Sequence, residues 1–272
     1  MKYYRLTKNR AQICFLILTS FLSASSASEK FSEEKLSGVY LGLEGGVSVS
    51  NHILLAPDWT ETNCNFLQIW TPTGSDSFDT YLGTAKCIGF KVGYQINPII
   101  SCDVTYNYQG EFSSQRGYSP NLIASLNFLL GDIYTFKNIS IQTVLFNINL
   151  SPNIQWGGFV PYISGGVGLA SNKIGCMERR NLNYSTEYPL LYDLILYGKR
   201  TTCFSWQAGI GAYYVFHNNW RFGMAYRFLD VGQLTTGNYC TDAVSKASAS
   251  AMRFIAKHPT FSELLVSLTY CF

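Results

Sequence analysis

The chain has 272 residues, enough for one large or two small domains, and carries 20 Lys and Arg against 17 Asp and Glu. Residues 1–27 hold four of the basic residues and none of the acidic ones, so the rest of the chain holds 16 basic and 17 acidic residues. The excess of positive charge therefore belongs to the first residues, and we expect no nucleic acid as a partner.

The first 27 residues have the pattern of a signal peptide. A positively charged start precedes an apolar stretch at 13–22, and small residues follow it up to Ala27. The apolar stretch is shorter than the about 20 residues that a membrane-spanning helix needs. We predict a signal peptide over 1–27, a charged periplasmic lead-in over 28–37 and one domain over 38–272. The positive start consists of Lys2, Arg5, Lys8 and Arg10.

The domain alternates between apolar and polar or small residues over eight stretches. Such alternation predicts β-strands whose two faces have different surroundings. In 99–112, for example, Val104 and Tyr106 share one face, while Asp103 and Gln109 lie on the other. The predicted strands cover 38–50, 84–96, 99–112, 139–150, 159–170, 202–216, 220–231 and 262–272.

This pattern fits either a soluble β protein or a closed barrel that spans a membrane, in which each strand satisfies the backbone groups of the next. Polar side chains along one whole face suit the interior of a membrane barrel. Connection lengths favour the same interpretation, because short periplasmic turns and long surface loops alternate in such barrels. The short connections are 97–98, 151–158 and 217–219, and the long ones are 51–83, 113–138, 171–201 and 232–260.

Aromatic residues cluster at the turn ends of the predicted strands, as in the girdle of a membrane barrel. They are Tyr94, Trp156, Tyr162, Phe216 and Trp220. The last strand also ends on its apolar face, which carries Val266, Leu268, Tyr270 and Phe272. A closing strand that ends in Phe resembles the C-terminal signal of bacterial outer-membrane barrels, which the barrel-assembly machinery reads.

Three segments resemble strands of the OmpA/Opa-like family of eight-stranded outer-membrane barrels. They are FVPYISGGVGLA at 159–170, WQAGIG at 206–211 and MAYRFLDVG at 224–232. The similarity covers about 38–272 and leaves the loops unmatched. It implies an all-β, transmembrane, antiparallel up-and-down barrel of about eight strands in a Gram-negative outer membrane. It also implies long extracellular loops, periplasmic termini, and outer-membrane lipid and the barrel-assembly machinery as partners.

Two stretches of the long loops, 121–134 and 189–197, are apolar for surface loops. Exposed apolar patches often mark a partner or membrane site. Two alternatives are that the strands continue beyond the bilayer, or that an extra hairpin makes the barrel ten-stranded.

Charged residues also fall on the predicted inward faces of the strands. The interior of an eight-stranded barrel is about filled by side chains, so mixed charges there favour a salt-bridged plug over a conducting path. Because buried charges need partners, we expect Glu44 or Asp103 to pair with Arg221 or Arg227. The complete predicted lumen network is Glu44, Lys91, Asp103, Glu111, Arg221 and Arg227.

Seven cysteines follow the predicted leader, and export to an oxidising compartment makes disulfides plausible. Cys64 and Cys87 bracket the first long loop, and Cys176 and Cys203 bracket the third, so each pair is a predicted disulfide. No C-x-x-C motif is present, and we expect no metal site and no cofactor.

The chain has three histidines, His52, His217 and His258. No predicted strand carries a histidine beside a serine at the spacing that a nucleophile and its base need. We therefore expect no catalytic residues and no enzyme.

Three hypotheses for the function follow. The favoured one is a non-enzymatic surface protein, structural or adhesin-like, whose long loops contact a host surface or another protein. The alternative is a porin-like conduit for small solutes or lipid. The third is a surface hydrolase that modifies lipid.

Overall fold

The computed structural model describes residues 38–57, 78–112, 117–118, 132–152, 158–181, 194–216, 219–242, 248–250 and 253–272. The predicted signal peptide and lead-in lie outside these ranges. Every regular element within them is a strand, and no helix among the described residues is long and apolar enough to cross a membrane.

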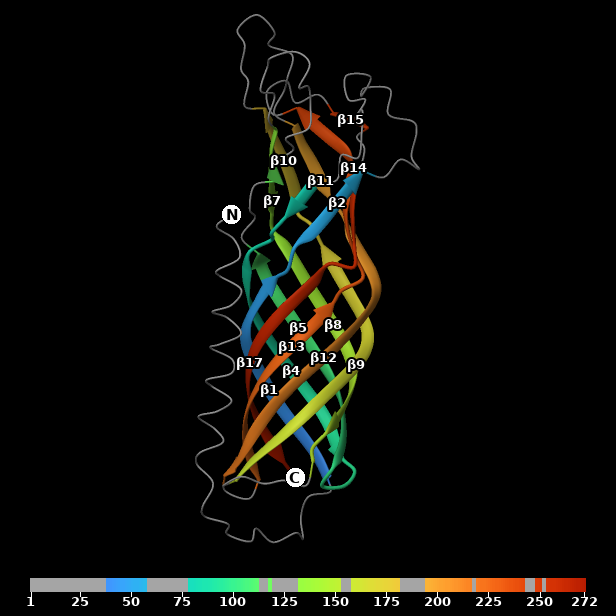
Figure 1. Ribbon diagram of the computed structural model, residues 1–272. Coiled ribbons are helices and arrows are strands. Elements are labelled where there is room, and N and C mark those ends of the chain that lie inside the picture. Colours follow the sequence, from blue (N-terminus) through green and yellow to red (C-terminus); the bar gives the residue numbers. More distant parts are fainter. Residues whose placement is uncertain are drawn as a thin grey trace, which may run out of the picture.

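Eight long strands form a closed antiparallel barrel. They are β1 (Gly38–Ser50), β4 (Thr84–Gln95), β5 (Ile100–Phe112), β8 (Ile139–Leu150), β9 (Phe159–Lys173), β12 (Arg200–Phe216), β13 (Trp220–Asp230) and β17 (Thr260–Cys271). Their order around the ring is β1-β17-β13-β12-β9-β8-β5-β4 (Figure 1), and the ring closes where Leu43 lies opposite Leu268. Each strand has neighbours on both sides, so no further strand can enter. The predicted eight-stranded barrel is confirmed, and the ten-stranded alternative is wrong.

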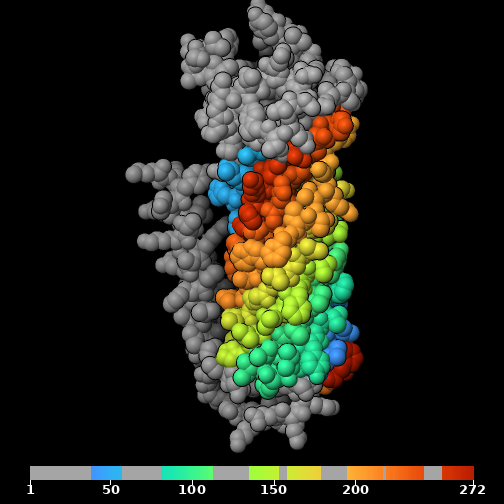
Figure 2. All heavy atoms as spheres, turned by 90° about the vertical axis from the view of Figure 1, so that its right-hand side faces the viewer, coloured from blue at the N-terminus to red at the C-terminus, as the bar shows by residue number. Residues whose placement is uncertain are grey.

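The outer face of the barrel carries a continuous apolar band. Leu43, Ile88 and Phe204 are the most exposed of its strand residues, at 68%, 66% and 61%. On β13 the outward apolar residues run from Trp220 to Phe228, which is roughly 20 Å at a rise of about 3.4 Å per residue and a tilt of about 40°. Figure 2 shows neighbouring strands as tilted bands that lie side by side on one face. The height of the band is close to that of the lipid-facing surface of membrane barrels.

Aromatic rings pack together beside the C-terminus, which lies at the lower end of the barrel in Figure 1. The ring centres of Tyr270 lie 5.0 Å from those of both Trp220 and Phe272. Tyr162 does not join them, because it belongs to the inward-facing positions of β9 and lines the lumen. The prediction of Tyr162 as a girdle residue is therefore wrong, while Trp156 lies outside the described residues.

The long connections form a second set of strands above the barrel, which we call the upper tier (Figure 1). Its strands pair in the order β3-β2-β16-β14-β11-β10-β7-β6, and β15 pairs with β14. The strands therefore continue beyond the apolar band. They are β2 (Ile53–Pro57), β3 (Phe78–Thr80), β6 (Gly117–Tyr118), β7 (Asp132–Lys137), β10 (Cys176–Asn181), β11 (Leu194–Gly198), β14 (Gln233–Asp242), β15 (Ser248–Ser250) and β16 (Phe254–Lys257).

One hydrophobic core runs from the upper tier into the barrel. Phe136 and Met177 of the tier and Phe261 of the barrel are at most 1% exposed and belong to the same cluster. We call the barrel part of this core the apolar plug. It consists of Phe112, Ile139, Ile141, Leu145, Leu229 and Phe261. Both parts bury apolar surface against each other, so the tier and the upper barrel are stabilised together.

Candidate functional site

The lumen holds the charged side chains that the strands place on their inward faces. Arg227 of β13 forms ion pairs with Glu263 of β17, through Nε, and with Glu44 of β1, whose carboxylate oxygen lies 3.3 Å from Nη1. Gln109 of β5 donates a hydrogen bond from Nε2 to the other oxygen of Glu263. We call Glu44, Gln109, Arg227 and Glu263 the charged crossbar.

The charged crossbar spans the width of the lumen. Strands β5 and β13 are four places apart in a ring of eight, so they stand on opposite sides of the barrel. Glu263 is fully buried and Arg227 is 5% exposed. The two carboxylates accept hydrogen bonds from Nε and Nη1 of Arg227, whereas its Nη2 has no hydrogen-bond partner in the structure. Buried charges of this kind persist only when they are paired.

A second network lies closer to the short turns and surrounds Asp103 of β5. The hydroxyl of Tyr40 donates to Asp103 at 2.9 Å, and the hydroxyl of Thr105 donates at 2.8 Å. The amides of Asn147 and Asn149 donate at 2.6 Å and 2.8 Å. Four neutral donors therefore fill the acceptor positions of this carboxylate.

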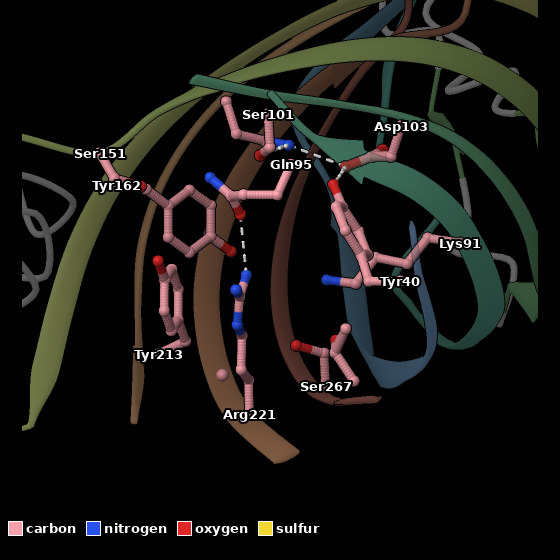
Figure 3. Close-up of a pocket in the computed structure, with 13 residues that line it drawn as sticks. Tyr40, Lys91, Gln95, Ser101, Asp103, Ser151, Tyr162, Tyr213, Arg221 and Ser267 are labelled. Atoms are coloured by element: carbon pink, nitrogen blue, oxygen red, sulfur yellow. Dashed lines mark hydrogen bonds between the residues drawn. The ribbon is translucent and has the colours of Figure 1, made fainter. Parts of the chain in front are cut away.

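A cavity of about 60 Å³ lies between these networks and the short turns (Figure 3). Arg221 enters it from β13, with Nη1 donating to the amide oxygen of Gln95 at 2.9 Å and the guanidinium 5.0 Å from the ring centre of Tyr213. Lys91 and Tyr40 face Arg221 from the other side, and Tyr162 lies beside Tyr213. The cavity is polar and cationic, with space for a few water molecules.

Beyond the charged crossbar the lumen is filled by the apolar plug. Leu145, Leu229 and Phe261 are fully buried, and the Phe261 ring lies 5.1 Å from that of Phe112. Close packing of this kind leaves few voids larger than a water molecule. No residue of the crossbar or the plug lines the cavity, so both separate it from the upper tier.

The structure pairs Glu44 with Arg227, one of the combinations that the sequence suggested. Asp103 and Arg221 instead make hydrogen bonds to neutral groups. The prediction for Glu111 is wrong: it is exposed with a φ of 44°, and the β5–β8 register shifts between Gln109 and Phe112. A bulge there adds a residue and changes which side chain points inward.

Glu263, a fully buried member of the crossbar, was missing from the predicted network. The signal was present, because Glu263 alternates with the outward residues Leu264 and Val266 and so falls on the inward face of the last strand.

The predicted disulfide between Cys176 and Cys203 is wrong, because both are free thiols. Cys176 of β10 lies opposite Tyr197 of β11, whereas Cys203 of β12 lies opposite Ala170 of β9, six residues away along each chain segment. The distance between them along the strands is roughly 20 Å, beyond the about 7 Å that a disulfide spans between Cα atoms. Cys87 is also free and buried, and its predicted partner Cys64 lies outside the described residues.

Cys176 is expected to react slowly with alkylating agents. Partial burial, and next the Glu178 carboxylate, raise the pKa of this thiol, although Lys137 opposes them. A raised pKa means less of the reactive thiolate at a given pH. Iodoacetamide should therefore modify Cys176 without reductant, but more slowly at pH near 8 than a cysteine introduced by Lys173→Cys at an exposed position. The modification rates, measured by mass spectrometry, should converge as the pH rises. Faster modification of Cys176 than of the introduced cysteine would contradict the raised pKa.

The described histidines lie at the upper end of the barrel. The hydroxyl of Tyr81 shares a hydrogen bond with Nε2 of His52, and Nδ1 of His258 lies 3.2 Å from the Asp230 carboxylate. Neither histidine bonds to a serine, threonine or cysteine within the part of the chain that the structure describes. His217 lies outside it. Nor does this part contain a cluster of His, Cys, Asp and Glu able to hold a metal ion.

Chains of similar structure come from several bacterial outer membranes. Neisserial surface protein A is 13% identical over 87% of this chain and 98% of that chain, with a TM-score of 0.46. OprG from Pseudomonas aeruginosa is 11% identical over 89% and 99%, with a TM-score of 0.48. The protease OmpT from Escherichia coli is 9% identical over 90% and 99%, with a TM-score of 0.41.

A comparison with curated proteins found no match. Among protein families, the one described as outer membrane protein beta-barrel domain matches residues 14–252. This match spans most of the chain, and the described strands close into a barrel with an apolar outer face. The chain therefore belongs to the outer membrane protein β-barrel family and is an outer-membrane protein.

Proposed function

We propose that the chain is a non-enzymatic, non-conducting surface protein that displays the upper tier outside the cell. The observation that carries this proposal is the closure of the lumen. The charged crossbar spans the barrel, and the apolar plug fills the space above it. A conducting eight-stranded barrel would need a continuous water-filled path, and a dry core of Leu, Ile and Phe side chains leaves no such path.

The orientation in the membrane rests on the lengths of the connections. The short turns and the C-terminus lie at one end of the barrel, and all nine strands of the upper tier lie in the long connections at the other. Outer-membrane barrels place short turns in the periplasm and long connections outside. On this basis the tier is extracellular, and the C-terminus and the lumen cavity face the periplasm.

The upper tier offers a surface for a partner, either a host component or another protein. Tyr197 of β11 and Tyr239 of β14 are 52% and 58% exposed. These strands are neighbours, and the Tyr197 hydroxyl accepts a hydrogen bond at 3.1 Å from Thr241. Tyrosine is enriched in protein interfaces because it supplies a large apolar face and a polar tip.

Conductance separates this proposal from the porin-like alternative. The purified, refolded barrel is expected to give no stable channel in a planar bilayer, because the plug and the crossbar close the lumen. Reproducible openings in wild-type protein would overturn the non-conducting role and favour the conduit. Heat-modifiable migration on a gel provides the check that each sample is folded.

Labelling of intact cells tests the surface display. An epitope inserted after Asp242, at the end of β14, should bind antibody on intact cells. The same epitope inserted after Phe216, at the end of β12 in a short turn, should bind only after the outer membrane is permeabilised. The reverse pattern would contradict the orientation.

A further inference from the structure

The lining of the cavity at the turn end of the lumen carries more positive than negative charge. Two cations, Lys91 and Arg221, and one carboxylate, Asp103, line it. We propose that this cavity is a binding site for a small oxyanion, such as phosphate or a carboxylate. The ligand enters and leaves by the turn end, because the crossbar and the plug close the other side.

Arg221 is built into the site but lacks an anionic partner. It is 9% exposed, and the only hydrogen bond it makes among the described residues goes to the neutral amide of Gln95 at 2.9 Å. A guanidinium has five N–H donors in a planar fork that matches the oxygens of phosphate or carboxylate. The donors that Gln95 leaves unused belong to a side chain that borders the cavity.

Lys91 supplies the second positive charge. Its side chain lies on the inward face of β4 and faces Arg221 across the cavity (Figure 3). No carboxylate forms an ion pair with Lys91 within the described ranges. Two cations that face one small space repel each other unless an anion lies between them, and an oxyanion there would be attracted to both.

Asp103 supplies the carboxylate of the cavity, but this carboxylate is already hydrogen-bonded to other side chains. Its oxygens accept hydrogen bonds from four neutral donors, so its acceptor positions are used without either cation. Tyr40, one of these donors, also lies between Asp103 and Lys91 in Figure 3. The arrangement leaves the cavity with a net positive charge on the side where Lys91 and Arg221 meet.

The size and the neutral lining of the cavity limit the ligand. A volume of about 60 Å³ admits a small ion or a few waters, and not a nucleotide or a lipid headgroup. The hydroxyls of Tyr213, Ser267 and Thr269 line the same space and are able to donate to an oxyanion. The ligand class is therefore a small free oxyanion.

Binding of inorganic phosphate to the refolded barrel in a nonionic detergent tests this inference. Isothermal titration calorimetry should find one phosphate per chain, and acetate should compete for the same site. Arg221→Met and Lys91→Met should each weaken binding at least about tenfold, or about 1.4 kcal/mol. The matched control is Lys86→Met, which removes the same charge from an exposed, outward position on the same strand. It should leave binding unchanged.

If the charge variants do not fold, a variant that keeps every charge still tests the inference. Ser267→Leu fills the cavity and should abolish phosphate binding while the barrel remains heat-modifiable. Wild-type protein that binds no phosphate up to about 10 mM would overturn the inference, as would an equal loss in Lys86→Met. The site is independent of the proposed function: a conducting barrel that binds phosphate contradicts only the latter, and a silent barrel that does not bind contradicts only the site.

Discussion

Replacing Arg227 with Met is expected to lower the free energy of unfolding by about 3–5 kcal/mol. The side chain holds the carboxylates of Glu44 and Glu263 in a part of the lumen where Glu263 has no solvent exposure. Without the guanidinium, two like charges remain buried and without a cationic partner, and each keeps its desolvation cost. Urea titration of the barrel in lipid vesicles measures the loss.

The matched control for this experiment is Arg221→Met. Arg221 is inward-facing on the same strand, but its partners are the neutral Gln95 amide and the Tyr213 ring. Its removal leaves no unpaired carboxylate, so the expected loss is about 1–2 kcal/mol. A loss in Arg227→Met no larger than that in Arg221→Met would show that the crossbar does not depend on charge pairing.

A double variant isolates the cause. Adding Glu263→Gln to Arg227→Met removes one of the two unpaired carboxylates and should restore part of the lost stability. Residues in one network interact by about 0.5–3 kcal/mol in such cycles. If the two changes were simply additive, the loss in Arg227→Met would come from packing and not from the buried charges.

The barrel strands could be predicted because one physical rule governs them. A strand between lipid and a polar lumen must alternate along its whole length, so β13 presents Phe222 and Met224 outward and Arg221 and Arg227 inward. The same rule placed Glu44 and Arg227 on inward faces. Only β17 separates β1 from β13 in the ring, so the two inward side chains are close enough to pair.

The upper tier, the outward position of Glu111 and the cysteine pairing could not be predicted, because alternation along the strands does not encode them. The strands of the upper tier are short and lie within long connections, where no lipid enforces a regular pattern, so β2 or β11 has no clear signal of its own. A single bulge was enough to remove Glu111 from the lumen. The cysteine pairing failed for a similar reason, since proximity to a loop neck says nothing about the strand register that separates Cys176 from Cys203.

The lumen cavity could not be predicted from the sequence either. Lys91 and Arg221 were predicted to face inward, but a predicted face does not say which charges meet. Asp103 was an expected partner for Arg221, and it is instead surrounded by Tyr40 and the amides of Asn147 and Asn149. Only the packed structure shows that Asp103 bonds to neutral groups while Lys91 and Arg221 face each other across the cavity.

Replacing Phe261 with Ala is expected to cost about 3–5 kcal/mol of unfolding free energy. Phe261 is fully buried in the apolar plug and packs against Phe112, with ring centres 5.1 Å apart. Truncation removes the aromatic contacts and leaves a cavity enclosed by strands, which relax little because the ring of the barrel is closed. The core also reaches Phe136 and Leu234 of the upper tier, so the tier should become more susceptible to protease in the variant.

The control makes the same chemical change on the lipid-facing side. Phe222 is 47% exposed on the outward face of β13, and acyl chains can occupy the space that its ring leaves. Phe222→Ala should therefore lose less than half as much stability in the same urea titration, and it should leave the protease sensitivity of the tier unchanged. Equal losses in the two variants would mean that the plug is not a packed core. A stable Phe261→Ala barrel with an intact tier would mean that tier and barrel fold independently. The expected result, a large loss inside and a small one outside, ties the closure of the lumen to the stability of the surface that the barrel displays.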